Sequence, residues 1–333
     1  MAVGPGVHLG LDLGGTNLKW AVVEHEFGEW RVLDRGQERT RSSDGPDAVV
    51  RQISAIARAA IETRAAISTV GVGVPGLYDP ATGSTRFLVN VPGDWDGRPV
   101  AAPIHAEVGL PVALINDARA FGLAELRLGA ARGADSMIGL TLGTGVGGVI
   151  AIDGRVVLGH DGTAGELGHQ TIDPDGPLCN CGNRGCVEAF ARADRIAEAC
   201  GTASVEDAVA AAHAGDPQAL DGLTRVGTAL GIGIANMITV LSPDRVVLGG
   251  GVAAAGDALF DPIRTELRRR VHTTSLERVE LVTAELGTFA GAIGAAIHGM
   301  EAVADTDGKA GAAAGAGAAS VAGSVGASRA SAS

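Results

Sequence analysis

Short apolar blocks that end at glycines or polar turns recur along the chain. Val7–Leu13 and Leu18–Glu24 are two such blocks on either side of Gly14–Asn17, a pattern that predicts two strands joined by a tight glycine turn. Residues 47–66 then carry apolar side chains at helical spacing, and Thr69–Gly76 indicates a buried strand that runs into a turn. The first part of the chain is therefore expected to form a hairpin followed by a helix and a further strand.

The same order of elements occurs a second time. Residues 111–117 indicate a strand that ends in two polar residues, residues 118–131 have helical periodicity, and residues 136–154 form another pair of apolar blocks broken by glycines. Strand, glycine turn and strand thus recur at Asp12–Lys19 and Leu142–Ile150. This duplication predicts two similar lobes that face one cleft.

The last third of the chain changes in character. Ala189–Ala235 is largely helical, with breaks near Gly201 and at residues 215–217, and residues 244–252 indicate a buried strand that meets the start of a helix. From about Asp305 the composition is mostly Ala, Gly and Ser. Such a segment buries too little apolar area to offset the entropy of ordering it, so we expect a disordered tail.

Length and charge narrow the class of protein. The chain has 333 residues and a formal net charge of −12, which favours two lobes and argues against a general affinity for nucleic acid. The first thirty residues contain no apolar run of signal-peptide or membrane length, so we expect a cytoplasmic protein that does not enter a membrane. A small solute is the expected ligand.

The segment Glu166–Glu188 carries the densest chemistry, because a histidine and three cysteines lie between two carboxylates. The candidate metal ligands are His169, Cys179, Cys181 and Cys186. Thiolates and imidazole suit tetrahedral zinc, and with all four positions filled the zinc would be structural. The alternative is a disulfide, but Cys179 and Cys181 are too close for easy pairing and Cys200 lies in a helical stretch beyond the cluster.

The first glycine turn has groups that a nucleotide phosphate needs. It offers open backbone amides, a hydroxyl, and a carboxylate able to hold a hydrated Mg²⁺ ion. The candidate residues are Asp12, Gly14, Gly15, Thr16, Asn17 and Lys19. The segment is not a P-loop, because the pattern GxxxxGK[ST] is absent and the glycines lie between strands. In isolation an ordinary glycine hairpin is an equal alternative.

Two further glycine clusters extend this prediction. The second turn offers the same amides and hydroxyl from the other lobe, through Gly143, Thr144, Gly145 and Gly147. A third cluster, Gly249, Gly250 and Gly251, follows an apolar strand and would let a nucleoside or a helix approach the backbone closely. Helix packing remains the alternative function of this third cluster.

Asp117 is the candidate catalytic base. Asn116 and Asp117 close an apolar strand, and open α/β sheets bind ligands at the carboxyl ends of their strands. The alternative is that Asp117 caps the helix that starts near Ala118, a position that Asp suits well.

The motifs GLDLGGTNLK, INDARA, LGTGVGG, GELGH and CNCGNRGCVE occur in this order, and the chain resembles the ROK family of sugar kinases and repressors from about Leu9 to Met300. The resemblance implies an α/β, two-lobed actin-like ATPase (ribonuclease H-like) fold with a cleft between the lobes. We expect an N-terminal lobe over residues 1–117, a C-terminal lobe over 118–290, a C-terminal helix over 291–303 that returns to the N-terminal lobe, and a tail over 304–333.

The resemblance also implies roles for individual residues. The first two glycine loops would hold the phosphates of ATP with Mg²⁺, residues 249–251 would border the adenosine, and Asp117 would be the general base. The sugar hydroxyls would be bound by Asn116, Glu166, His169 and Glu188, with Asn90 as a further candidate, and His169 would also ligate zinc. Many family members carry an acidic residue before the Asn-Asp pair, where this chain has Ile115, so one polar contact near the sugar is expected to be missing.

The function implied by the resemblance is ATP-dependent phosphorylation of the C6 hydroxyl of a glucose-like hexose. One alternative is a kinase of the same family for an amino sugar such as glucosamine, N-acetylmannosamine or kanosamine, because the motifs do not separate these substrates. A ROK repressor or another non-catalytic sugar sensor is the other alternative. Repressors of this family carry an amino-terminal helix-turn-helix, for which the sequence before Asp12 leaves no room. We expect a homodimer or homotetramer.

Overall fold

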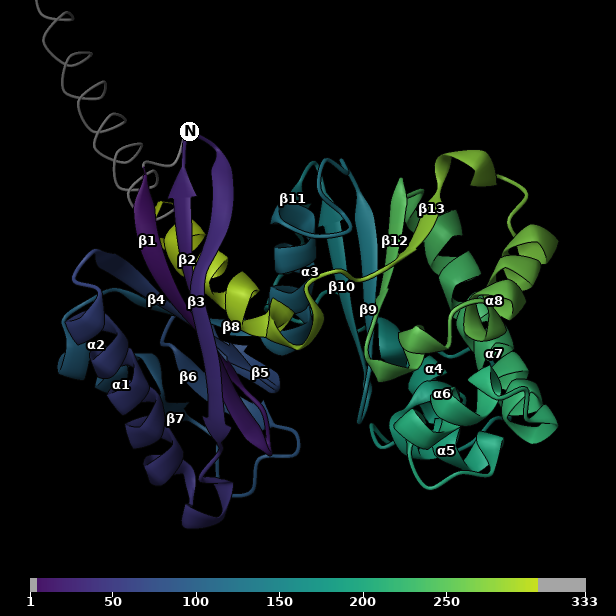
Figure 1. Cartoon of the computed structure of the whole chain (residues 1–333), viewed down its shortest axis with the longest axis horizontal. Helices are drawn as coiled ribbons and strands as arrows, with labels where there is room; N and C mark the ends of the chain where they lie inside the picture. The colour runs from purple at the N-terminus through teal and green to yellow at the C-terminus, as the bar shows by residue number, and fades with distance from the viewer. Residues whose placement is uncertain (1–4, 305–333) are drawn as a thin grey trace, which may run out of the picture.

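The computed structural model describes residues 5–304, which form two halves with a helical layer between them (Figure 1). The tail predicted over residues 304–333 therefore lies outside the described residues, apart from Ala304. Each half is built on a mixed five-stranded sheet.

The sheet of the first half has the strand order β3-β2-β1-β4-β8. Its strands are β1 (Gly6–Leu13), β2 (Asn17–Glu26), β3 (Glu29–Arg39), β4 (Ile67–Val74) and β8 (Val112–Asn116). The predicted glycine-turn hairpin is present, since β1 and β2 pair antiparallel, whereas β1, β4 and β8 run parallel. Because the carboxyl ends of parallel strands meet at one edge, the segments that follow β1, β4 and β8 lie together.

One face of this sheet is covered by two helices, and a small sheet stands beside it. These elements are α1 (Pro46–Thr63), α2 (Ala101–Val108), the 3₁₀ turn η1 (Ser42–Asp44) and the three-stranded sheet of β5 (Gly76–Asp79), β6 (Ser84–Leu88) and β7 (Arg98–Pro99). Pro46 stands in the first turn of α1, where its missing N–H has no intrahelical partner to lose. The helix ends at Thr63, before the predicted limit at residue 66, because the backbone then turns into β4.

The second half repeats the scheme with the strand order β11-β10-β9-β12-β13. Its strands are β9 (Met137–Leu142), β10 (Val146–Ile152), β11 (Arg155–Val156), β12 (Arg245–Gly249) and β13 (Glu280–Thr283). Strands β9 and β10 form the second predicted hairpin, and β9, β12 and β13 run parallel. The segments after β9 and β12 therefore share one edge, as they do in the first half.

Helices cover the outer face of the second sheet (Figure 1). They are α4 (Val187–Ala191), α5 (Ala193–Cys200), α6 (Val205–His213), α7 (Pro217–Leu241) and α8 (Asp257–Arg270). The connections of this half contain the 3₁₀ turns η2 (Leu167–His169), η3 (Gly251–Ala255), η4 (Leu276–Arg278) and η5 (Gly287–Phe289). Gly201, the predicted break, ends α5 in a left-handed conformation. Helix α7 alone among residues 5–304 is long and apolar enough to cross a membrane, but 61% of its apolar window is buried in the fold, as in a core helix.

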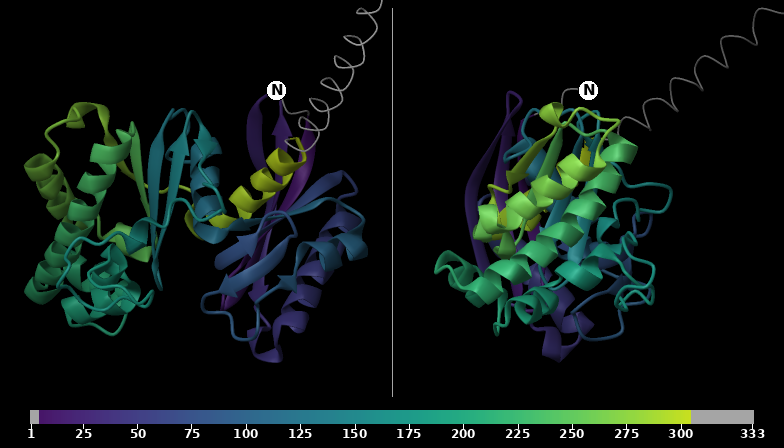
Figure 2. Two further views of the ribbon diagram at one scale, coloured as in Figure 1. Left: turned by 180° about the vertical axis from the view of Figure 1, so that it is seen from behind. Right: turned by 90° about the vertical axis from the view of Figure 1, so that its right-hand side faces the viewer.

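The layer between the sheets consists of α3 (Asp117–Arg127) and the helical residues 290–304 (Figures 1 and 2). This second helix lies directly against the first sheet: a Cβ on Gly10 would come within 1.9 Å of the Ala292 carbonyl oxygen, and one on Gly71 within 1.7 Å of the Ala295 carbonyl oxygen. Ile115, 1% exposed, belongs to the apolar core of this layer. An acidic side chain at that position would be buried there without any contact to solvent.

Candidate active site and metal cluster

The carboxyl edge of the first sheet brings two carboxylates together. Asp12 lies near the end of β1 and is aligned with Gly73 of β4, while Val74 is aligned with Asn116, the residue before Asp117. The negative charge of Asp12 raises the pKa of Asp117. The first glycine turn and the predicted base therefore share one site, although they are about a hundred residues apart in the chain.

Asp12 is held in a desolvated position. Its carboxyl group packs against the start of the helix over residues 290–304, where a Cβ on Gly291 would lie 2.7 Å from its Cγ. Burial raises the pKa of Asp12, and the neighbouring charge of Lys19, its partner across the hairpin, acts in the opposite direction. A cation beside this carboxylate would favour its charged form and offset the cost of its burial.

The first glycine turn is clamped by residues that the sequence did not single out. The Thr40 hydroxyl donates to the Gly14 carbonyl at 2.6 Å, and the Ser42 hydroxyl donates to the Gly15 carbonyl at 3.1 Å. On its other side, Gly15 abuts Asn90, whose carbonyl oxygen would lie 2.2 Å from a Cβ at that position. Asn90, exposed and in a left-handed conformation at φ 62°, is thus placed beside the turn.

Asp117 has the electrostatic character of a base poised near neutral pH. Burial, together with the charges of Asp12 and Glu166, raises the pKa of Asp117 to about 7, although a hydrogen bond from the Ala118 amide and the charge of Arg119 act in the opposite direction. The alternative role as the helix cap is wrong. Asn116 caps α3, since its Oδ1 accepts from the amides of Ala118 and Arg119 at 3.0 and 3.2 Å.

A buried arginine connects several predicted sugar ligands. Arg119, 1% exposed, donates from Nη1 to Asn116 Oδ1 at 2.8 Å and forms an ion pair with Glu166 Oε1 at 2.8 Å. Asn116 Nδ2 donates to the Gly76 carbonyl at 3.1 Å, which leaves its second N–H for a ligand. Glu166 Oε2 lies 3.9 Å from His169 Nε2. Asn116, Glu166 and His169 therefore lie in one connected group beside Asp117.

The second and third glycine clusters meet in a pocket of about 350 Å³. Gly143, Thr144 and Gly251 line it together with residues of α5, α6 and the loop between them, namely Asp194, Ser204, Val205 and Glu206. Gly250 lies at φ 100°, and a Cβ on it would come within 1.9 Å of the Leu142 carbonyl oxygen. Gly250 is therefore required because the chain passes directly over the end of β9. No motif in the sequence indicated that residues of α5 and α6 would line this pocket.

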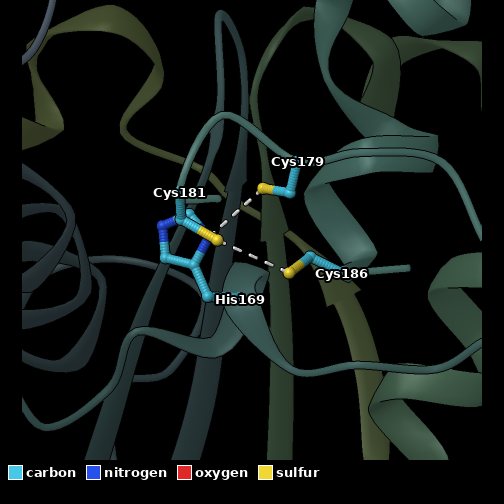
Figure 3. Close-up of side chains that lie close together, drawn as sticks. All are labelled: His169, Cys179, Cys181 and Cys186. Atoms are coloured by element: carbon cyan, nitrogen blue, oxygen red, sulfur yellow. Dashed lines mark hydrogen bonds between the residues drawn. The ribbon is translucent and has the colours of Figure 1, made fainter. Parts of the chain in front are cut away.

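The metal-ligand candidates converge as predicted (Figure 3). His169, Cys179, Cys181 and Cys186 each offer one ligand atom, and these atoms lie within 4.8 Å of one another. Cys181 Sγ lies 3.7 Å from Cys186 Sγ, and Cys179 Sγ lies 3.7 Å from His169 Nδ1. Sulfur atoms bound at about 2.3 Å to one tetrahedral zinc ion lie about 3.8 Å apart. These four residues, hereafter the metal cluster, can hold a metal ion.

The disulfide alternative is wrong for the cysteines of this chain. All four cysteines are free thiols, and the 3.7 Å between the sulfur atoms of Cys181 and Cys186 is far beyond the S–S bond length of about 2.05 Å. Cys200 is separate from the cluster, because its thiol donates to the Ala219 carbonyl within the helical core.

Glu188 links the metal cluster to the second glycine turn. Its Oε2 accepts from the Val146 amide at 2.9 Å, and its Oε1 lies 3.4 Å from Cys179 Sγ. The same carboxylate is adjacent to Gly145, where a Cβ would lie 2.5 Å from Oε2. With 9% of its surface exposed, Glu188 is held between the two loops, and its position couples them.

Comparison with known proteins agrees with this arrangement. The model of the ROK family matches residues 8–300. The chain is 35% identical over 313 residues to a glucokinase of Thermotoga maritima, which covers 86% of this chain and 95% of the relative. The ROK hexokinase structure from Thermus thermophilus superposes with a TM-score of 0.79 at 34% identity, over 90% of this chain and 99% of the other.

A second solved structure contains both types of ligand. It is a ROK family glucokinase from Streptomyces griseus in complex with glucose and AMPPNP, with a TM-score of 0.76 and 32% identity over 89% of this chain and 100% of the other. The predicted two-lobed, actin-like ATPase fold is thereby confirmed.

Proposed function

The chain belongs to the ROK family, and we propose that it transfers the γ-phosphoryl group of ATP to the C6 hydroxyl of a glucose-like hexose. The observation that carries this proposal is Asp117, a carboxyl group with a pKa of about 7 beside a glycine turn and a second carboxylate. A general base works best when its pKa lies near the operating pH. The glucokinase relatives and the complex with glucose and AMPPNP support the same reaction.

In this proposal Asp117 accepts the proton of the hydroxyl that attacks the γ-phosphorus. Glu166 and His169 bind sugar hydroxyls beside it, together with Asn116, Asn90 and Glu188. Carboxylates that accept from neighbouring hydroxyls are directional and strong readers of a polyol. Because Glu166 and Asn116 are anchored by Arg119, the sugar would meet groups that are already oriented, which lowers the entropic cost of alignment.

The nucleotide would lie between the two glycine turns. Gly14, Gly15, Thr16 and Asn17 would offer amides and a hydroxyl to the phosphates from the first half, with Lys19 nearby, and Gly143, Thr144, Gly145 and Gly147 would do so from the second. Gly249, Gly250 and Gly251 would border the adenosine, in the pocket that Gly251 lines together with Ser204 and Glu206. Asp12 would hold Mg²⁺ through its water ligands, and this ion would neutralise phosphate charge during transfer.

We further propose that the metal cluster binds structural Zn²⁺. The donors are three sulfurs and one imidazole, and the 3.7 Å sulfur separation suits one tetrahedral ion. A metal on the Nδ1 side of His169 leaves Nε2 directed toward Glu166. The ring would then be held at a fixed angle to the sugar.

The decisive experiment measures ADP release from ATP with a panel of acceptors. The purified protein and Asp117→Asn are each assayed with glucose, mannose, fructose, glucosamine, N-acetylmannosamine and 3-amino-3-deoxyglucose. We expect turnover with glucose and a loss of about a hundredfold or more in Asp117→Asn. A preference for an amino sugar would assign the alternative substrate class. Full activity of Asp117→Asn, or ATP turnover that needs no sugar, would contradict the mechanism.

Further properties are proposed on the same basis. We expect a cytoplasmic homodimer or homotetramer with no affinity for nucleic acid, given the net charge of −12. Light scattering after size-exclusion chromatography measures the oligomeric state. Sugar binding by calorimetry without any phosphorylation would instead favour a non-catalytic sensor.

A further inference from the structure

We propose that Arg119 is the positioning residue of the sugar site, because it fixes the carboxylate of Glu166 in the orientation in which that carboxylate binds a sugar hydroxyl. The inference rests on the proposed function and adds a residue to it. Arg119 lies in the first turn of α3, two residues after Asp117, and it is buried.

Every nitrogen of the Arg119 guanidinium contacts an acceptor within the protein. Nη1 donates to Asn116 and pairs with Glu166, Nη2 donates to the carbonyls of Thr163 and Ala164 at 3.0 and 2.8 Å, and Nε donates to the Ala164 carbonyl at 3.1 Å. A guanidinium has five N–H groups, of which four donate these hydrogen bonds, and Nη1 also carries the ion pair with Glu166. Because Arg119 is 1% exposed and held by protein groups on every nitrogen, we infer that its effect passes through the groups that it holds.

Those groups belong to the site from both sides. Asn116 ends β8 in the first half, whereas residues 163–166 belong to the loop that leads into η2 and His169. The guanidinium thus ties the sugar-binding loop to the helix that carries the base. Glu166 keeps 37% of its side chain exposed while one oxygen is bound to Arg119, so its second oxygen remains available to a ligand.

The charge of Arg119 has a second consequence. Asp12 and Glu166 both raise the pKa of Asp117, and Arg119 is the charged group that lowers it. Without the guanidinium, Glu166 would be an uncompensated carboxylate next to another one. Arg119 therefore also permits two carboxylates to stand beside the sugar hydroxyl.

The test is a double-mutant cycle on the full-length protein with glucose and ATP. Arg119→Lys keeps the charge but loses the planar fork that contacts four acceptors. Glu166→Gln keeps the shape but loses the charge. We expect each single variant to raise the KM for glucose about tenfold or more, with the KM for ATP changed less than about twofold. In the double variant the two effects should not add, because Arg119 acts through Glu166.

A control variant and a second test variant make the result interpretable. Arg127→Lys removes another arginine fork from α3, which binds Glu301 and the Gly154 carbonyl at the far end of the helix, and it should leave the KM for glucose unchanged. Arg119→Gln, which can still donate to the Ala164 carbonyl, serves as a second variant if Arg119→Lys is unstable. Circular dichroism melting identifies the folded variants that enter the comparison.

The outcomes separate this inference from the proposed function. Absence of sugar phosphorylation by the unmodified protein would overturn the proposed function. If the unmodified protein is active, either of two results would overturn the role of Arg119. One is a folded Arg119 variant that keeps its KM for glucose, and the other is full additivity of the two effects in the double variant.

Discussion

Replacing Asp117 by Asn should make the protein inactive and more stable at the same time. The folded-state pKa of Asp117 is raised from 3.8 to about 7 by burial and by the charge of Asp12. The folded protein therefore favours the protonated carboxyl group, and ionisation of Asp117 costs stability. Asn imitates the protonated form, and its Oδ1 can still accept the 2.8 Å hydrogen bond from the Ala118 amide.

The expected magnitude follows from the shift. A change from 3.8 to about 7 corresponds to about 4 kcal/mol at about 1.4 kcal/mol per pKa unit. Asp117 keeps part of its surface exposed to solvent. Solvent screening therefore reduces the full value, and we expect Asp117→Asn to raise the free energy of unfolding by about 2 kcal/mol. The penalty is absent below pH 4, grows as the pH rises through 4 to 7, and is constant above that range.

The assay is urea unfolding of both proteins at pH 5 and pH 8.5. The difference in the free energy of unfolding should favour Asp117→Asn by about 2 kcal/mol at pH 8.5 and by roughly a third of that at pH 5, which lies early in the window between 3.8 and about 7. Asp96→Asn, at an exposed carboxylate, is the control and should show no such pH dependence. An equal difference at both pH values would refute the raised pKa, whatever the effect on catalysis.

Three other perturbations test separate parts of the structure. Chelation of the metal should lower the melting temperature. It should also raise the KM for the sugar more than the KM for ATP, because His169 is proposed both to ligate the metal and to bind the sugar. Equal changes in both KM values would count against this prediction. Glu125→Ala should lower the free energy of unfolding by about 3 kcal/mol, because the buried Glu125 carboxylate accepts from the amides of Ala130, Glu285 and Leu286. Urea unfolding measures this loss of stability, and a loss below about 1 kcal/mol would contradict the argument. Gly71→Ala should cost about 3 kcal/mol in the same assay, since its Cβ would lie 1.7 Å from the Ala295 carbonyl oxygen, whereas Gly73→Ala, with 3.5 Å to its nearest atom, should cost much less.

Local patterns predicted the hairpins and the metal cluster well. A glycine turn between two apolar blocks needs only neighbouring residues to form, and β1–β2 and β9–β10 are both present. The four metal ligands lie within eighteen residues of one another, so a compact loop brings them together. Element ends were less predictable, as α1 ends before residue 66 and α7 continues to Leu241. Packing against neighbouring elements decides such limits.

Interactions between distant segments had no such signal. Arg119 appeared in the sequence as one charged residue in a helix, yet in the fold it is fully buried beside Glu166. Thr40 and Ser42 follow β3, and only the pairing of β2 with β3 carries them to the first glycine turn. The cap of α3 was assigned to Asp117 as an alternative, but the backbone entering the helix places Asn116 in that position.

The sequence by itself determined which groups the protein has and where the chain turns: two glycine turns between strands, an Asn-Asp pair at a strand end, and the thiols and imidazole of the metal cluster. These features depend on spacing within a few residues. Only the tertiary structure decided their electrostatics and their partners, because parallel strands bring Asp12 and Asp117 to one edge, where Arg119 pairs with Glu166 from the other half. Desolvation and charge at that edge raise the pKa of Asp117, and a pKa depends on everything nearby in space rather than in sequence.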